Sequence, residues 1–248
     1  MSMPRFFVPK GNIREGRGTI TDQELVHMRK VLRLRPGDRV TLFDNEGWEH
    51  EGIIQSYAAG VGEIGIVKSY QPERESSLDV TLAQALGKGE KMDWVVEKAT
   101  ELGVRTIVPF LSSYTVPRLD ADKMERRHAR WKKIALSAAK QSGRARIPDI
   151  LGVSDFRELV RRPWPCELKL LFWEKESLRN LNQLRGENVH LNSLLLVIGP
   201  EGGFSQDEAS EAIRHGFQSI RLGRRILRSE TAALASLSIV QFLWGDIG

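Results

Sequence analysis

The C-terminal two thirds of the chain alternates between short apolar runs and longer amphipathic runs. Met92, Val95, Val96, Ala99 and Leu102 follow the spacing of a helix with one buried face. Buried strands are predicted at 78–83, 105–110, 169–172, 194–198 and 217–222. Helices are predicted at 92–102, in a long basic segment ending near 141, at 206–215 and at 230–243. This alternation predicts an α/β fold with a mostly parallel sheet covered on both faces.

The first 70 residues have a different pattern, typical of short strands joined by tight turns. Strands are predicted at 39–44, 48–57 and 63–70, and a short helix at 22–31. Thr21 followed three residues later by Glu24 is typical of a capping box at the start of that helix. These features predict a small β-barrel-like module.

A polar, aperiodic stretch separates the two patterns and is interpreted as a linker. The sequence therefore predicts one domain over residues 1–71, a linker over 72–77 and a second domain over 78–248.

The charge distribution adds a candidate partner. The chain has 37 Lys and Arg against 32 Asp and Glu, a net charge of +5 that alone barely favours a polyanion. Residues 5–39, however, carry nine basic and four acidic side chains, and residues 123–146 carry nine and one. Two separate basic segments favour contact with nucleic acid, although either segment alone is equally compatible with a solvated helix face.

The sequence lacks the residues that several other kinds of site or segment require. Cys166 is the single cysteine, which excludes a disulfide within the chain and a cysteine-rich metal site. The five histidines show no metal-ligand spacing, so no metal is expected. The N-terminus has no signal-like apolar stretch, and no apolar run approaches the roughly 20 residues of a membrane span. We therefore expect a cytoplasmic protein without membrane contact.

Residues 60–65 match the GxGxxG pattern of dinucleotide-binding proteins, but in the wrong context. That pattern has to open a helix, whereas these glycines lead into a predicted strand. They are interpreted as turn glycines. The chain also lacks the P-loop, GxSxG and HExxH patterns.

Two glycine-bearing loops near the C-terminus are the strongest candidate site. GPEGG at 199–203 and the loop 222–232 each follow a predicted strand and precede a predicted helix. In an open α/β sheet, ligands bind beyond the carboxyl ends of the strands, where such loops lie. Each loop taken alone is also compatible with a tight turn, but the pair favours a site for a flat ligand.

These loops resemble two motifs of the SPOUT superfamily, the trefoil-knotted methyltransferases that use S-adenosylmethionine. More narrowly, nearly the whole chain resembles the bacterial 16S ribosomal RNA uracil-N3 methyltransferase family. The supporting segments are HMRKVLR at 27–33, PGD at 36–38, AQALGKGEKMD at 83–93, EKATELG at 97–103, QSGR at 141–144, GPEGG at 199–203 and LRSETA at 227–232. Gly87 departs from the family pattern, which has proline there.

The resemblance implies an N-terminal PUA-like barrel, a knotted α/β methyltransferase domain and a homodimer. It also implies that the product is N3-methyluridine near the 3′ end of 16S ribosomal RNA in the small ribosomal subunit. A knot would be an exception to the rule against threaded loops.

The resemblance further implies a pocket for S-adenosylmethionine with three walls. The implied donor-binding residues are Leu171, Phe172, Trp173, Glu174, Ile198, Gly199, Pro200, Gly202, Gly203, Leu222, Gly223, Ile226, Leu227, Arg228, Thr231 and Ala232. Arg228 could stabilise developing charge on the uracil oxygens. Either Glu201 or Glu230 could accept the N3 proton, and spacing does not choose between them.

Basic residues in both predicted domains are candidate phosphate contacts. They are Arg5, Arg29, Arg33, Arg35, Lys88, Lys98, Arg144 and Arg146. Three alternatives stay open on the residues alone: a SPOUT enzyme acting on another RNA such as tRNA, a non-catalytic RNA-binding assembly factor, and, least favoured, a nicotinamide enzyme.

Overall fold

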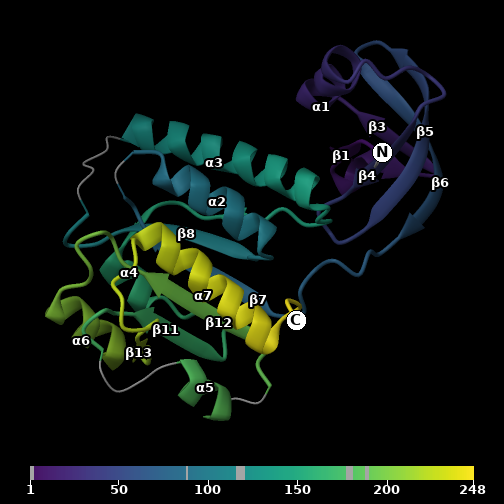
Figure 1. Ribbon diagram of the computed structural model, residues 1–248. Coiled ribbons are helices and arrows are strands. Elements are labelled where there is room, and N and C mark those ends of the chain that lie inside the picture. Colours follow the sequence, from purple (N-terminus) through teal and green to yellow (C-terminus); the bar gives the residue numbers. More distant parts are fainter. Residues whose placement is uncertain (1–2, 88, 116–120, 177–180, 188–189) are drawn as a thin grey trace. The chain divides into compact units, whose positions relative to one another are not determined.

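The computed structural model describes residues 3–87, 89–115, 121–176, 181–187 and 190–248. Figure 1 shows the elements, which group into two compact units. The first unit comprises Met1–Glu75 with Ala139–Ile147, and the second comprises Ser76–Ala138 with Pro148–Gly248. The sequence placed 139–147 with the C-terminal domain, whereas in the structure this segment packs with the first unit.

The first unit is built on a six-stranded sheet in the order β1-β4-β5-β6-β3-β2. Its pairs are antiparallel except for β1, which runs parallel to β4. The strands are β1 Arg5–Phe7, β2 Ile13–Arg14, β3 Arg17–Ile20, β4 Arg39–Phe43, β5 Glu49–Ala58 and β6 Val61–Tyr70. A 3₁₀ turn, Lys10–Asn12, precedes β2. Phe6, Met28, Leu42, Ile54 and Ile64 are buried in its core.

The helix predicted over 22–31 is present in two parts. Helix α1, Asp22–Val26, continues into a π-helical turn, His27–Val31. Thr21 is the N-cap residue of α1, as predicted, but its side chain forms no cap, so the capping box is absent. The Thr21 hydroxyl donates to the Asp22 carboxylate at 2.8 Å, and Glu24 instead pairs with Lys140 at 2.8 Å. A longer-range ion pair has replaced the local cap.

The GxGxxG segment opens a strand and not a helix, as predicted. Gly60 lies in the turn after β5 with a φ of +78°, and residues 61–65 already belong to β6.

The second unit contains one parallel sheet in the order β10-β8-β7-β12-β11-β13, with the short β9 also pairing β8. Every pairing in it is parallel. The strands are β7 Asp79–Ala85, β8 Thr106–Leu111, β9 Asp149–Ile150, β10 Ser154–Asp155, β11 Leu168–Phe172, β12 Ser193–Ile198 and β13 Gln218–Ile220. The prediction of a parallel α/β sheet is confirmed.

Helices cover both faces of this sheet. The helices are α2 Lys91–Glu101, α3 Ala121–Ser142, α4 Phe156–Arg161, α5 Leu181–Glu187, α6 Gln206–Arg214 and α7 Ser229–Trp244. Helices α2 and α7 pack against each other, with α7 on β12, while α4 and α6 pack together against β8 and β13. Among the described residues, none of the helices combines the length and apolar character that crossing a bilayer requires.

Two predicted helix ends are confirmed in detail. Gly103 follows α2 with a φ of +81°, the left-handed conformation common at this position. Ser205 caps α6: its hydroxyl accepts from the Glu208 amide at 3.2 Å, and the Glu208 carboxylate accepts from the Ser205 amide at 2.9 Å.

The end of the chain doubles back across the sheet. Strand β13 pairs with β11, but α7, the next helix, packs on β12 and α2. The segment 221–228 therefore returns from β13 past the carboxyl ends of β11 and β12. This return places the second glycine loop beside the first.

Candidate functional site

A partly open cavity of about 260 Å³ lies at the carboxyl ends of β11, β12 and β13. Three segments that leave these strands form its walls: 172–174, 198–203 and 221–227. Ser229 and Ala232 of α7 complete the lining. Because the strands are parallel, their carboxyl ends share one edge of the sheet, which is where α/β proteins bind ligands. The volume lies near the lower end of small-molecule sites, roughly 300 Å³.

The first glycine loop packs closely against its surroundings. Gly203 has a φ of +69°, and a Cβ added there would lie 2.5 Å from a carboxylate oxygen of Glu174. A Cβ at Gly199 would lie 3.0 Å from the Phe204 ring. The Gly203 amide donates to the Pro200 carbonyl at 2.9 Å, which closes the turn. Glycine is therefore required for this loop to lie against Glu174 with its backbone beside the cavity.

The second loop offers a different surface. Gly223 has a φ of +144° and open space where a side chain would point. Ile226 is 86% exposed although it is a large apolar residue. An exposed apolar side chain beside a cavity suits the face of a flat ligand ring.

A buried chain of hydrogen bonds joins the two loops. The Gln84 amide nitrogen donates to the Ser229 hydroxyl at 2.8 Å, and that hydroxyl donates to the Gly199 carbonyl. Gln84 and Ser229 are both buried, with exposed fractions of 2% and 9%. Strand β7, the start of α7 and the loop after β12 are thereby tied together.

A cluster of three charges borders the same site. The Lys91 ammonium lies 2.9 Å from a carboxylate oxygen of Glu201 and 3.4 Å from one of Glu230. The hydrogen bond to Glu201 raises the pKa of Lys91, an effect that burial partly opposes. Lys91 therefore stays charged at neutral pH.

The structure brings most of the predicted donor-binding residues to the cavity. Those that line it are Phe172, Trp173, Glu174, Ile198, Gly199, Pro200, Gly202, Gly203, Leu222, Gly223, Ile226, Leu227 and Ala232. The other three do not. Leu171 points into the core of the sheet, Arg228 is the N-cap of α7, and Thr231 is exposed in its first turn. Leu171 lies inside β11, whereas the lining residues Phe172, Trp173 and Glu174 lie at and beyond its carboxyl end.

The two candidate bases differ in position. Glu201 lines the cavity, whereas Glu230 does not and has a side chain only 16% exposed. The third predicted catalytic residue, Arg228, is also absent from the cavity lining.

Sequence reasoning missed four lining residues: Arg221, Arg224, Arg225 and Ser229. All four lie within or next to the second loop, so their proximity to its motif was an available signal. Lys91 and Gln84 were also missed as site residues. Both lie in the segment 83–93 that resembles the family, but their partners are remote in sequence, so their roles could not be assigned.

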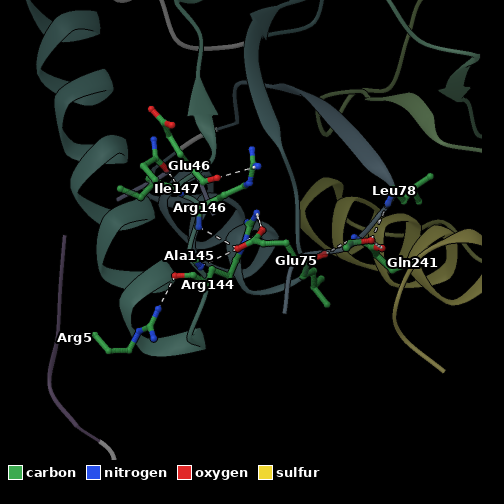
Figure 2. Close-up of polar contacts among 12 residues, drawn as sticks. Arg5, Glu46, Glu75, Leu78, Arg144, Ala145, Arg146, Ile147 and Gln241 are labelled. Carbon is green, nitrogen blue, oxygen red and sulfur yellow. Dashed lines mark hydrogen bonds and ion pairs between the residues drawn. The ribbon is translucent and has the colours of Figure 1, made fainter. Parts of the chain in front are cut away.

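Among the candidate RNA contacts, Arg144 is bound by an acid of the first unit (Figure 2). Its side chain is 5% exposed and donates through Nε and Nη2 to the Glu75 carboxylate, at 3.2 and 2.8 Å. Glu75 also accepts the backbone amides of Ala145 and Arg146 at 2.9 and 3.0 Å. Arg144 therefore holds segment 139–147 within the first unit, and its buried guanidinium is not placed to contact phosphate.

Arg5 also has its partners within the first unit. It pairs with the buried Glu49 at 2.6 Å and donates to the Arg144 carbonyl at 2.8 Å. Arg146 donates to the Glu46 carbonyl at 3.2 Å. Lys98 pairs with two acids of its own helix, Glu97 and Glu101, each at 2.8 Å.

Three candidate RNA contacts are exposed on the first unit: Arg29, Arg33 and Arg35. Arg29 belongs to the π-helical turn and lies over the Tyr57 ring, 4.9 Å from its centroid. Arg33 has a φ of +55° just beyond that turn. Lys88 lies outside the described residues.

Comparison with known proteins places these features in a family. Residues 74–241 match a family described as an RNA methyltransferase domain, and residues 20–56 match an RNA methyltransferase PUA domain. Ribosomal RNA small subunit methyltransferase E of Bacillus subtilis is 31% identical over 247 residues, which cover 97% of this chain and 96% of that protein.

Solved structures show the same likeness. A Legionella pneumophila methyltransferase in complex with bound S-adenosylmethionine superposes with a TM-score of 0.89 at 33% identity, covering 99% of this chain and all of the other. A Neisseria gonorrhoeae ribosomal RNA small subunit methyltransferase E bound to S-adenosylmethionine gives 0.88 at 33% identity, with full coverage of both chains.

Proposed function

The chain belongs to the ribosomal RNA small subunit methyltransferase E family, and we propose that it methylates N3 of one uridine near the 3′ end of 16S ribosomal RNA. The methyl donor is S-adenosylmethionine. The observation that carries this proposal is the cavity between the two glycine loops, in a chain that aligns over its full length with relatives crystallised with that donor.

The residues around the cavity fit such a donor. Glycine backbone at 199–203 allows an adenine ring to approach closely, and Ile226 and Leu227 can cover its face. The lining carries two carboxylates, Glu174 and Glu201, beside three arginines, so a positively charged sulfonium is favoured where it lies next to a carboxylate. When bound, the donor supplies an electrophilic methyl group.

Methylation at N3 also requires the loss of a proton. We propose that the Glu201 carboxylate accepts the N3 proton, because Glu201 lines the cavity and Glu230 does not. The nitrogen lone pair forms the bond to the methyl carbon, and the electrons of the broken carbon–sulfur bond stay on sulfur. Arg228, or Arg221, Arg224 and Arg225 of the lining, would stabilise charge on the uracil oxygens.

The substrate has to present an unpaired base. N3 lies on the Watson–Crick edge, so the target uridine must be single-stranded or flipped out. Arg29, Arg33 and Arg35 are exposed on the first unit and suit contacts with phosphates, which position RNA without reading its sequence.

We further propose a homodimer with a knotted second unit, acting in the cytoplasm on the assembled small subunit. Two large apolar side chains on the packed pair α2 and α7, Trp94 and Phe242, are 44% and 63% exposed, which suits a protein interface. The return of 221–228 past the ends of β11 and β12 supports the crossing that a knot needs.

The proposal can be tested in two steps. Calorimetry with the purified protein should show binding of S-adenosylmethionine. Mass spectrometry of 16S RNA from a strain lacking the gene should show loss of N3-methyluridine, restored when this chain is expressed. Donor binding with methylation of tRNA alone would favour the alternative RNA substrate. Absence of donor binding would favour a non-catalytic RNA-binding factor.

A further inference from the structure

Lys91 connects three elements of the second unit that are far apart in sequence. It begins α2, Glu201 lies in the loop after β12, and Glu230 lies in the first turn of α7. The ammonium is within 2.9 Å of the Glu201 carboxylate and 3.4 Å of the Glu230 carboxylate. The Lys91 and Glu201 side chains are 35% and 36% exposed and that of Glu230 is 16% exposed, so one partly exposed cation serves two acids.

Glu201 lies between two spaces. On one side is the donor cavity, and on the other is a small recess lined by Gln84, Gly87, Lys91 and Glu230, among others. Lys91 belongs to the recess and not to the cavity lining. Lys91 therefore contacts the Glu201 carboxylate from the recess.

The recess is tightly built. A Cβ added at Gly87 would lie 3.1 Å from the Glu201 carboxylate, and the Glu230 Oε2 atom is buried without a hydrogen bond. A buried carboxylate oxygen needs a compensating charge nearby, and Lys91 is the cation beside it. Glu230 thus anchors Lys91, and Lys91 in turn contacts Glu201.

We propose that Lys91 is a positioning residue for methyl transfer, which holds the Glu201 carboxylate ionised at the border between the recess and the donor cavity. This inference rests on the proposed function and deepens it, because it assigns the group that prepares the proton acceptor. Lys91 does not touch the reacting atoms. It acts through Glu201.

The electrostatic reasoning gives a sign for each substitution. A cation in contact with a carboxylate favours its charged form, and a second carboxylate nearby disfavours it. Two charged side chains near Glu201 lie in the recess, Lys91 and Glu230. Four more lie in the cavity lining: Glu174, Arg221, Arg224 and Arg225. Removing the Lys91 charge should therefore raise the pKa of Glu201. Removing the Glu230 charge should lower it, since Lys91 then serves Glu201 alone.

The test compares the pH dependence of kcat in Lys91→Met, Lys91→Arg, Glu230→Gln and the unchanged protein. The substrate is small ribosomal subunits from a strain lacking the gene, with labelled S-adenosylmethionine. For Lys91→Met we expect the acid limb of the profile to move to higher pH, so that kcat falls most at acidic pH. Donor KM should change little, and Lys91→Arg should restore most of the rate.

Glu230→Gln gives the opposite expectation: its acid limb should move to lower pH. This variant keeps Lys91 and tests the proposal even if Lys91→Met folds poorly. Arg161→Met is the matched control. It removes a cation from the exposed Arg161–Glu211 pair between α4 and α6 and should leave the profile unchanged.

Coincident pH profiles of Lys91→Met and the unchanged protein would overturn the inference, as would a loss of rate without a shifted acid limb. A collapse of kcat in Glu230→Gln would also overturn it, by identifying Glu230 as the base. If the unchanged protein itself neither binds S-adenosylmethionine nor methylates the subunit, the proposed function fails first, and this inference fails with it.

Discussion

The Ser229 hydroxyl donates a hydrogen bond to the Gly199 carbonyl over 2.5 Å and so joins the start of α7 to the loop after β12. Gln84 of β7 donates to the same hydroxyl from the middle of the sheet. Ser229 thus holds both loops of the donor cavity with one side-chain oxygen. The spacing of those loops depends on a residue that the loop motifs alone did not identify.

Replacement of Ser229 by alanine should weaken donor binding. The Gly199 carbonyl and the Gln84 amide would both lose a buried partner, at a cost of about 1–3 kcal/mol. We expect roughly tenfold weaker S-adenosylmethionine binding by calorimetry and a lower Tm. Ser229→Thr keeps the hydroxyl and should bind better than Ser229→Ala. Ser236→Ala, a buried change on the same helix, removes only a bond to Ala233 and should leave donor affinity intact.

Replacement of Gly203 should close the donor site. Gly203→Ala adds a Cβ that meets Glu174 at 2.5 Å and forces a side chain into left-handed backbone. Gly203→Val should be still more severe, with donor binding undetectable by calorimetry. Gly89→Ala is the matched control, because Gly89 has a φ of +68° but no atom within 4 Å of the added carbon. Equal losses of donor affinity in the two alanine variants would show that backbone strain alone was responsible.

Glu75 should be important for the stability of the first unit. Glutamine there leaves the nearly buried Arg144 without its counter-charge, so we expect a loss of about 3 kcal/mol in the free energy of unfolding, as when a buried pair is broken. Urea unfolding measures this, and trypsin should cleave after Arg144 or Arg146 faster than before. Glu211→Gln breaks an exposed pair with Arg161 and should have a much smaller effect. Similar effects of the two substitutions would contradict the structural role of Glu75.

The first unit should lose stability at high pH through Tyr70. Burial, reinforced by its hydrogen bond to Glu49, raises the pKa of Tyr70 to about 12, above the usual value near 10. The folded state therefore binds the proton more tightly than the unfolded state, and this contribution is complete below pH about 10. It is lost as the pH rises from there through about 12. Ultraviolet titration should show one of the three tyrosines ionising last, and Tyr70→Phe should remove that step.

Arg33 should contribute to RNA binding through charge alone. Arg33→Gln should weaken binding to the small subunit and reduce the slope of log K against log salt by about 1. Arg214→Gln, an equal change of charge on the exposed side of α6, is the control and should leave the slope unchanged. An unaltered slope in Arg33→Gln would remove Arg33 from the RNA-binding surface.

Local patterns predicted the long elements well. The apolar stripe of α2 and the capping residues of α6 lie within a few positions of one another, so neighbouring residues determine them. The brief strands β1, β2, β9 and β10 were missed because two or three residues carry too little pattern. The order of strands in either sheet was also beyond reach, since pairing joins distant segments. The packing of 139–147 with the first unit depends on Glu75 in the same way.

The predictions for the site differ in the same way: residues that are contiguous in sequence were found, and residues with remote partners were not. Both glycine loops were found because their residues are contiguous, and most of them line the cavity. Arg5 and Arg144 were predicted to contact RNA. A sequence shows that a residue is basic but does not show whether an acid of the same chain pairs with it. In the structure Arg5 pairs with the buried Glu49 and Arg144 with the partly buried Glu75. Lys91 was overlooked for the converse reason, because its two acids come from elsewhere in the chain.

The discontinuity of the first unit limits how this protein can be recombined. A chimaera made by one cut near residue 75 would receive the strands of one parent and segment 139–147 of the other. The Glu75 carboxylate would then face a foreign partner in place of Arg144. A graft that preserves the module must transplant both pieces, so exchange of target recognition between homologues requires two coordinated crossovers.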